Sequence, residues 1–239
     1  MNKAIIVPTY NEEEGIEKLI SEISKNVKDA DIFIIDDSIN NKIEEIVKKF
    51  KNINYFYRGQ KLGRGSAVLF GFNEALKKKK YDLLIEMDAD LSHDPSEINN
   101  NLKKLKEKNL DLLISSRYMS KSLIINWSFR RKIFSRCSNI LANYLLEVPV
   151  KDYTNGFRIY SVEASNFIIH NCGKVSGGFV MLSEILLKLH LNGFIIGETN
   201  TIFRNRTRGE SSVTLKEILN ALLGIIKLYL IKKNFKKYN

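Results

Sequence analysis

Polar and apolar positions along the first half of the chain follow two alternating periods. Short apolar or aromatic runs predict buried strands at residues 3–7, 31–35, 54–57, 81–87 and 111–116. Between them, apolar side chains recur at helical spacing in residues 16–23, 43–50, 68–76 and 98–105. Asn11, followed three residues later by Glu14, predicts a capped start of the first helix. This alternation predicts an α/β fold with a mostly parallel sheet covered by helices on both faces.

The second half of the chain has a different pattern. Residues 124–146 mix apolar side chains with arginine and lysine, which predicts a basic amphipathic helix. Such a helix could lie at a membrane interface or pack on the core with its arginines in water. Arg204, Arg206 and Arg208 alternate, so on a strand they would share one face, either gripping phosphates or facing solvent. A helix at residues 182–189 is expected to face the core.

The carboxyl-terminal region combines an apolar helix with a run of lysines. The helix begins at Leu215, and its basic end contains Lys232, Lys233, Lys236 and Lys237. This predicts either a peripheral membrane anchor facing anionic lipid or a packed helix with a basic tail. We therefore divide the chain into one domain at residues 1–212 and a membrane-proximal helix with its tail at 213–239.

The most informative stretch begins where the strand at residues 81–87 ends. Asp88 and Asp90 follow that strand, and Asp94 with Pro95 marks the start of the next helix. Carboxylates at the carboxyl end of a strand lie where open α/β sheets bind ligands. Mg²⁺ and Mn²⁺ take carboxylate oxygens and leave positions for substrate phosphates. The pair therefore indicates a metal clamp for a nucleotide diphosphate, with a solvated turn whose aspartates cap the next helix as the alternative.

Two further signals are expected at the same edge of the sheet. Asp36 and Asp37 follow the strand at residues 31–35, and a glycine-rich basic loop at 58–65 opens a helix. The loop resembles a phosphate cradle, although it matches neither a P-loop nor the dinucleotide-binding glycine motif. Two acidic strand ends beside a basic glycine loop favour a nucleotide-diphosphate site over a set of unrelated turns.

Composition limits the classes of protein that fit. The 239 residues suffice for one large domain, and the formal net charge of +11 predicts an anionic partner such as phosphate groups, an anionic membrane or nucleic acid. No nucleic-acid motif is present, so we expect no nucleic-acid partner. No apolar run reaches the ~18 residues of a membrane-spanning helix. We expect no signal peptide, because the first predicted strand starts almost at the amino terminus, and two unpatterned cysteines suit a reducing cytosol. We therefore expect a peripheral protein on the cytoplasmic side of a membrane.

Seven motifs in order resemble the dolichol-phosphate mannose synthase branch of the family-2 glycosyltransferases. They are residues 8–12, 35–37, 62–65, 87–95, 116–118, 152–158 and 206–211. Each motif is weak to moderate by itself, but seven at compatible spacing are specific, and together they cover nearly the whole chain. The resemblance implies a single GT-A (Rossmann-like) domain with a mostly parallel sheet and amphipathic interface helices.

The resemblance also implies a role for each matching position. Asp88 and Asp90 would bind Mg²⁺ or Mn²⁺, with Ser92 lining the site, and Asp90 and Arg117 would be the catalytic residues. Arg117, Arg131 and Ser135 would receive the acceptor phosphate. The donor-binding residues would be Pro8, Tyr10, Glu12, Ile35, Asp37, Asp88, Ala89 and Arg206.

The implied reaction is an inverting transfer of a hexose to dolichyl or another polyprenyl monophosphate, with GDP-mannose favoured as donor. A phosphate monoester has its second pKa near ~6, so the acceptor is already a dianionic nucleophile and needs no strong base. His93 could act as a base or simply form a local hydrogen bond.

Departures from the family pattern, which include Ser38, Met119, Leu182 and Ser212, leave the donor open. UDP-glucose with the same acceptor, a family member without turnover, and a non-catalytic basic binding protein remain alternatives. A separate membrane subunit is a further candidate partner.

Overall fold

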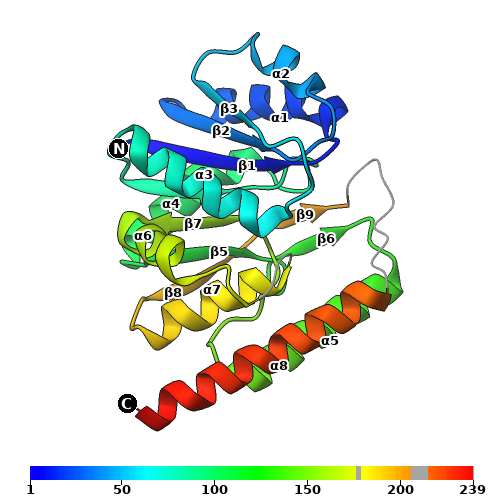
Figure 1. Cartoon of the computed structure of the whole chain (residues 1–239), viewed down its shortest axis with the longest axis vertical. Helices are drawn as coiled ribbons and strands as arrows, with labels where there is room; N and C mark the ends of the chain where they lie inside the picture. The colour runs from blue at the N-terminus through cyan, green and yellow to red at the C-terminus, as the bar shows by residue number, and fades with distance from the viewer. Residues whose placement is uncertain (176–178, 206–214, 239) are drawn as a thin grey trace.

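A seven-stranded sheet forms the centre of the protein, in a computed structural model that describes residues 1–175, 179–205 and 215–238 (Figure 1). The strand order is β3-β2-β1-β4-β7-β5-β8, and β7 is antiparallel to both of its neighbours while the other pairs are parallel. The strands are β1 (Lys3–Thr9), β2 (Ala30–Asp36), β3 (Ile53–Tyr57), β4 (Leu83–Glu86), β5 (Leu112–Ser116), β7 (Arg158–Ser161) and β8 (Ile196–Asn200). A parallel pair of β6 (Leu123–Ile125) and β9 (Ile202–Arg204) extends beyond the sheet.

Helices cover both faces of the sheet and bury two apolar layers. One layer contains α1 (Glu13–Asn26), α2 (Lys42–Val47) and α4 (Ile98–Glu107). The other contains α3 (Arg64–Lys78), α6 (Val162–Asn171) and α7 (Phe179–Leu191). Strands buried on both faces have continuous apolar sequences, which is why the strand runs were visible in the sequence. The predicted α/β class and the mostly parallel sheet are confirmed.

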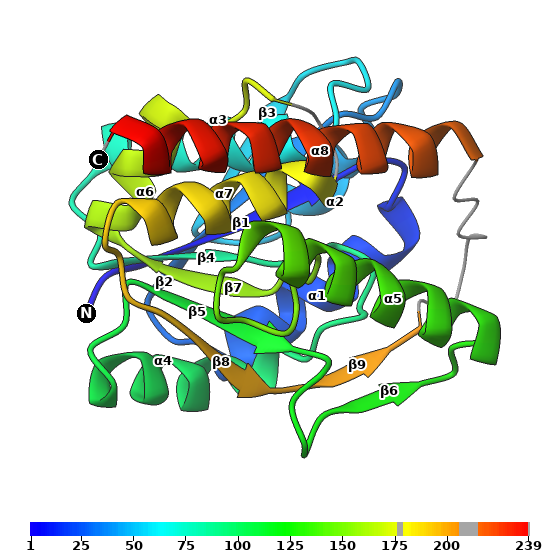
Figure 2. The same ribbon diagram turned by 90° about the horizontal axis from the view of Figure 1, so that it is seen from below.

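An outer layer is made by α5 (Phe129–Leu146) and α8 (Leu215–Tyr238), which lie side by side (Figures 1 and 2). α8 packs on α7 as well. The buried Lys232 amine joins the two outer helices, since it donates to the Leu145 carbonyl at 2.8 Å and pairs with Glu147 at 3.0 Å. Among the helices of the described residues, none is both long enough and apolar enough to cross a bilayer.

Several local expectations were wrong. Asn11 does not cap the first helix, because it adopts a left-handed conformation with φ 57°, and Glu12 occupies the N-cap position. The helix expected over residues 124–146 begins only at Phe129, after Ser128 caps it, and β6 precedes it. Strands β7 and β8 and helix α6 were not predicted from the sequence.

The parallel strands end on the side of the sheet where β6 and β9 lie (Figure 1). Asp37 follows β2, Asp88 follows β4 and Arg117 follows β5, so all three lie along this edge. Residues 152–157 reach the same edge because β7 runs antiparallel and starts there. The topology therefore brings together segments that are far apart in the sequence.

Candidate functional site

The acidic turn after β4 holds its two aspartates differently. The Oδ1 atom of Asp88 accepts a hydrogen bond from Arg64 Nε at 2.6 Å, and its Oδ2 atom lies 3.2 Å from His93 Nε2. Among the described residues, the side chain of Asp90 accepts one hydrogen bond, from the backbone N–H of Ser92 at 3.0 Å. Burial opposes ionisation of Asp88, but the Arg64 charge and the His93 hydrogen bond outweigh it and hold the pKa of this carboxyl well below its usual range. Asp88 is therefore an ionised carboxylate at neutral pH.

Arg64, the first residue of α3, is clamped in the centre of the site. Its guanidinium pairs with the fully buried carboxylate of Glu86 as well as with Asp88, and Nη2 donates to the Gly156 carbonyl at 3.2 Å. Tyr160 donates to the other Glu86 oxygen at 2.7 Å. A side chain at Gly156 would overlap the guanidinium. The guanidinium of Arg64, at the end of the basic glycine loop, therefore points at the carboxylates of Glu86 and Asp88.

Asp37 shapes the glycine loop from the end of β2. Its Oδ2 accepts the backbone N–H groups of Leu62 and Gly63 at 2.9 and 3.1 Å, and its Oδ1 accepts from Arg58 Nε at 2.6 Å. The neighbouring Asp36 is fully buried and accepts from the Thr9 hydroxyl at 3.0 Å. The two acids at the end of β2 thus fix the strand end and the glycine loop in place.

Four further positions that were predicted to bind the donor lie in or just after β1 and β2. Pro8 and Ile35 are partners in the register of the two strands, and Ile35 buries its side chain completely. The centroid of the Tyr10 ring lies 4.7 Å from the Lys61 ammonium, and Glu12 is the N-cap residue of α1. Tyr10, which follows β1, therefore lies against Lys61 of the glycine loop, and Arg64 of the same loop contacts the acidic turn at Asp88.

Arg117 is almost completely buried against a carboxylate and several aromatic rings. Its Nε and Nη2 atoms donate to the two oxygens of Asp152 at 2.8 and 2.7 Å, and Nη2 also donates to Thr154 at 2.6 Å. Burial acts against both charges, but their mutual attraction raises the pKa of Arg117 and lowers the pKa of Asp152. The guanidinium also lies 5.4 Å from the ring centroids of both Trp127 and Phe203.

Arg131, in the first turn of α5, approaches the same indole. Its guanidinium lies 4.2 Å from the Trp127 ring centroid, and Nη1 donates to Asn205 Oδ1 at 2.8 Å. Ser135, one turn later, accepts from the Tyr118 hydroxyl at 2.6 Å. Trp127 thus holds two arginines, one from the sheet edge and one from the outer helix. Arg206, together with Ser211 and Ser212, lies outside the described residues.

Sequence reasoning missed Arg64, Glu86 and Asp152 as organising groups of the site. One signal was available, because Glu86 lies within an apolar strand run and a buried carboxylate requires a partner. Asp152 gave no comparable signal, since a polar loop can hold an aspartate in water without a partner.

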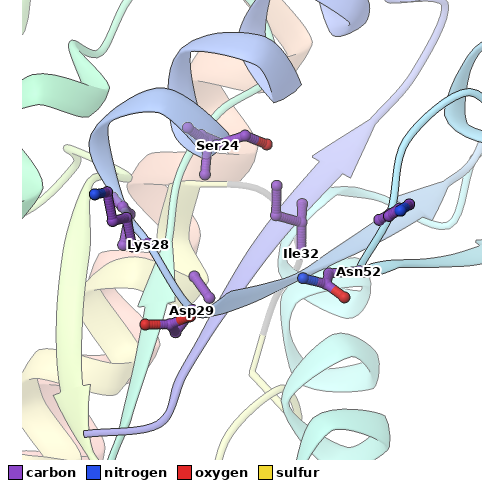
Figure 3. A pocket seen from close by; sticks show the side chains of 9 residues that line it. Ser24, Lys28, Asp29, Ile32 and Asn52 are labelled. Atoms are coloured by element: carbon purple, nitrogen blue, oxygen red, sulfur yellow. The ribbon is translucent and has the colours of Figure 1, made fainter.

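The cavity shown in Figure 3 lies elsewhere, at the amino end of β2. It measures about 90 Å³ and is lined by residues that include Ser24, Lys28, Asp29, Ile32 and Asn52. Parallel sheets bind ligands at the opposite, carboxyl edge. We therefore place the candidate site at the acidic turn and not at this cavity.

Known proteins resemble this chain in sequence over most of its length. The sequence model described as "Glycosyl transferase family 2" matches residues 4–168. A polyprenol monophosphomannose synthase of Mycolicibacterium smegmatis is 29% identical over 226 residues, which cover 92% of this chain and 84% of that protein. A dolichol-phosphate mannosyltransferase of Pyrococcus furiosus is 31% identical over 236 residues, which cover 95% of this chain but only 64% of that protein.

Solved structures share the fold at lower sequence identity. Glucosyl-3-phosphoglycerate synthase of Mycobacterium tuberculosis, in complex with Mn²⁺, UDP and phosphoglyceric acid, has a TM-score of 0.68 and 19% identity. The alignment covers 97% of this chain and 78% of that one. The same enzyme with Mn²⁺, UDP-glucose and phosphoglyceric acid also has a TM-score of 0.68. The likeness confirms the expected GT-A architecture.

Proposed function

The chain belongs to glycosyl transferase family 2 and is a glycosyltransferase, and we propose that it transfers a hexose from a nucleotide sugar to dolichyl or another polyprenyl monophosphate. Mannose from GDP-mannose is the favoured donor, and UDP-glucose is the alternative. The main observation behind the proposal is that one site combines an acidic turn, which contains Asp88, with two arginines. The guanidinium groups of Arg117 and Arg131 both contact the indole of Trp127. The named activities of the two curated relatives support the same acceptor class.

The residues of the acidic turn fit a divalent cation. The site has three carboxylates, at Glu86, Asp88 and Asp90. The Arg64 guanidinium neutralises one of these charges, so two negative charges remain, and carboxylate oxygens suit Mg²⁺ or Mn²⁺. Within the described residues, no group of three or more acidic, histidine or cysteine side chains could hold a metal by itself. Mg²⁺ commonly uses one or two carboxylates plus substrate phosphates. Asp88 and Asp90 would hold the ion, which when bound neutralises the departing diphosphate.

The acceptor phosphate fits the arginine side of the site. Arg117 and Arg131 contact the same indole, so a phosphate beside it would meet two guanidinium groups, and the Ser135 hydroxyl lies one turn further along α5. A phosphate oxygen attacks the anomeric carbon as the bond to the diphosphate breaks, and the configuration inverts. Because the acceptor is already a dianion, the arginines position it and no protein base removes a proton.

The donor would lie between the acidic turn and the glycine loop. Asp37 shapes the loop, because both of its oxygens accept from loop donors, and its proposed contact with the nucleoside would be additional to these bonds. The other proposed donor contacts are Pro8, Tyr10, Glu12, Ile35, Asp88, Ala89 and Arg206. Backbone groups make many of the contacts with the nucleobase in such a donor site, so an experiment with both donors is needed to distinguish guanine from uracil.

The outer helices provide a surface that fits a membrane containing anionic lipid. Large apolar side chains are exposed on α5 at Phe129, Ile133, Phe134, Ile140, Leu141 and Tyr144, and on α8 at Leu219, Leu222, Leu223, Ile226, Tyr229 and Leu230. Exposed basic side chains accompany them at Arg130, Lys132, Arg136, Lys227 and Lys233. Apolar groups beside cations favour the surface of an anionic bilayer. A lipid acceptor would reach Arg131 from this surface, and the two free cysteines suit the cytoplasmic side.

A lipid-extraction assay tests the proposed function. Purified protein is mixed with polyprenyl phosphate, Mg²⁺ or Mn²⁺, and separately labelled GDP-mannose, UDP-glucose or UDP-N-acetylglucosamine. We expect label in the organic phase with GDP-mannose, and its loss with EDTA. Label from UDP-glucose alone would correct the donor. No label from any donor, with a candidate membrane subunit supplied as well, would contradict the proposal.

Replacing Arg131 by alanine is expected to affect the acceptor more than the donor. A charged hydrogen bond contributes about 1.5–3 kcal/mol, so the KM for polyprenyl phosphate should rise roughly ten- to hundredfold. The KM for the nucleotide sugar should change little. Arg130→Ala is the matched control, because Arg130 is the exposed neighbour on the same helix. An unchanged lipid KM in Arg131→Ala would remove this residue from the acceptor site.

Polar substitutions on α8 are expected to weaken membrane binding. Leu219 and Leu223 are 59% and 57% exposed, so replacing both by serine should leave the fold unchanged. Each leucine withdrawn from lipid forfeits about 1 kcal/mol or more, which lowers vesicle partitioning roughly tenfold or more. Flotation with vesicles of phosphatidylcholine and phosphatidylglycerol measures this. Ile195→Ser, at a 49% exposed position in the turn before β8, should float like the wild type.

A further inference from the structure

His93 is enclosed within the acidic turn. Its side chain has no exposed surface, and its ring centroid lies 5.3 Å from those of both Phe157 and Phe203. Nε2 lies 3.2 Å from Asp88 Oδ2, whereas Nδ1 is buried and finds no hydrogen-bond partner among the described residues. Since a carboxylate accepts hydrogen bonds, the proton in this contact belongs to Nε2.

Packing alone does not account for a histidine at this position. An unpaired ring nitrogen in an aromatic environment is costly, so phenylalanine would suit the contacts with Phe157 and Phe203 better. Among the residues that the structure describes, Asp88 is the one polar partner of the His93 side chain. The chemical reason for the imidazole therefore lies in that hydrogen bond.

Asp88 receives one donor on each carboxylate oxygen. Arg64 holds Oδ1 and His93 holds Oδ2, so the plane of the carboxylate is fixed from both sides. Arg64 is fixed in turn by Glu86 and Gly156. Groups that orient a metal-binding side chain in this way commonly change metal affinity ten- to hundredfold when they are removed.

The histidine also attaches the acidic turn to β9. Its ring packs on Phe203, and the backbone N–H of Arg204 donates to the Ser92 carbonyl at 3.0 Å. Phe203 in turn contacts Trp127, the ring that holds both arginines of the acceptor side. These contacts fix the position of Asp88 relative to the residues that we propose bind the acceptor.

We propose that His93 is a positioning residue, whose Nε2–H orients the Asp88 carboxylate toward the divalent cation, and that it is not a base in the transfer. This inference rests on the metal assignment of the proposed function. The role proposed for His93 is that of a hydrogen-bond donor to Asp88, and it is neither a packing role nor a role in proton transfer. Its consequence is that the hydrogen-bond donor at residue 93, more than the ring, determines metal affinity.

Two substitutions separate a donor role from a packing role. His93→Gln keeps an N–H donor but loses the ring, whereas His93→Phe keeps a ring but loses the donor. We expect the dissociation constant of Mn²⁺, measured with saturating GDP by electron paramagnetic resonance of the free ion, to rise about tenfold or more in His93→Phe. In His93→Gln it should stay within about threefold of the wild type. If packing were the whole role, the order of the two variants would reverse.

Further measurements make each outcome decisive. The melting temperature without Mn²⁺ reports packing separately, and His93→Met provides a second variant without a donor if His93→Phe does not fold. Wild-type Mn²⁺ affinity in the folded donor-free variant would overturn the positioning role while leaving the metal assignment in place. If Asp88→Asn binds Mn²⁺ as tightly as the wild type, the metal assignment and the positioning role both fall.

Discussion

Replacing Asp90 by asparagine is expected to reduce sugar transfer by about a thousandfold or more while leaving the fold intact. The substitution keeps the shape of the side chain and the bond from the Ser92 N–H, but it removes one of the two charges proposed to hold the cation. Losing several kcal/mol of charge stabilisation at the departing diphosphate corresponds to about three powers of ten in rate. Initial rates of label transfer to the organic phase measure the effect.

Asp94 offers a matched control for this substitution in the same turn. Its carboxylate caps the 3₁₀ turn Pro95–Glu97 by accepting from the Ser96 N–H at 2.9 Å. Asparagine caps equally well, so Asp94→Asn should retain near wild-type transfer. Wild-type turnover in Asp90→Asn, or an equal loss in Asp94→Asn, would contradict the assignment of Asp90 to the metal.

The acidic edge of the sheet was predictable because it depends on local patterns. Apolar runs place the ends of β1, β2, β4 and β5, and parallel strands bring those ends to one edge. Asp37 and Asp88 could therefore be placed together from the sequence, whereas Arg117 was placed in the site only by the family resemblance. Asp94 and Pro95 likewise marked the next helical turn by local chemistry alone.

The partners of these groups could not be predicted, because they come from distant segments. Arg64 reaches Asp88 across 24 residues of sequence, and it contacts the Gly156 carbonyl across 92. Periodicity gives the strands but not their order, so the insertion of antiparallel β7 between β4 and β5 left no signal. That insertion carries residues 152–157 into the site.

Asp37 shows how a correct position can have an unexpected partner. The sequence pattern correctly placed Asp37 at the edge of the sheet where the parallel strands end, and its contact with the nucleoside stays a prediction. In the structure its oxygens accept from Arg58 and from the N–H groups that shape the glycine loop. A strand-end aspartate can serve the loop or the ligand equally well, and one sequence does not distinguish the two.

Replacing Asp152 by alanine is expected to destabilise the protein severely. Asp152 is completely buried and accepts from the Arg117 backbone N–H and guanidinium, so its removal leaves an unpaired charge in the core. Breaking one side of a buried ion pair typically costs about 3–5 kcal/mol. Urea unfolding should show this loss in the free energy of unfolding.

The double variant Arg117→Met with Asp152→Asn separates the unpaired charge from lost packing. It should be more stable than Asp152→Ala, because no buried charge remains. The pH dependence provides a second check. The folded protein holds the pKa of Asp152 below its unfolded value of about 3.9, so this group stabilises the fold above that pH and loses its effect as the pH falls. The difference in stability between wild type and Asp152→Asn should therefore shrink below about pH 4. A difference that stayed constant down to the lowest measurable pH would show that Arg117 is not held by an ionised Asp152.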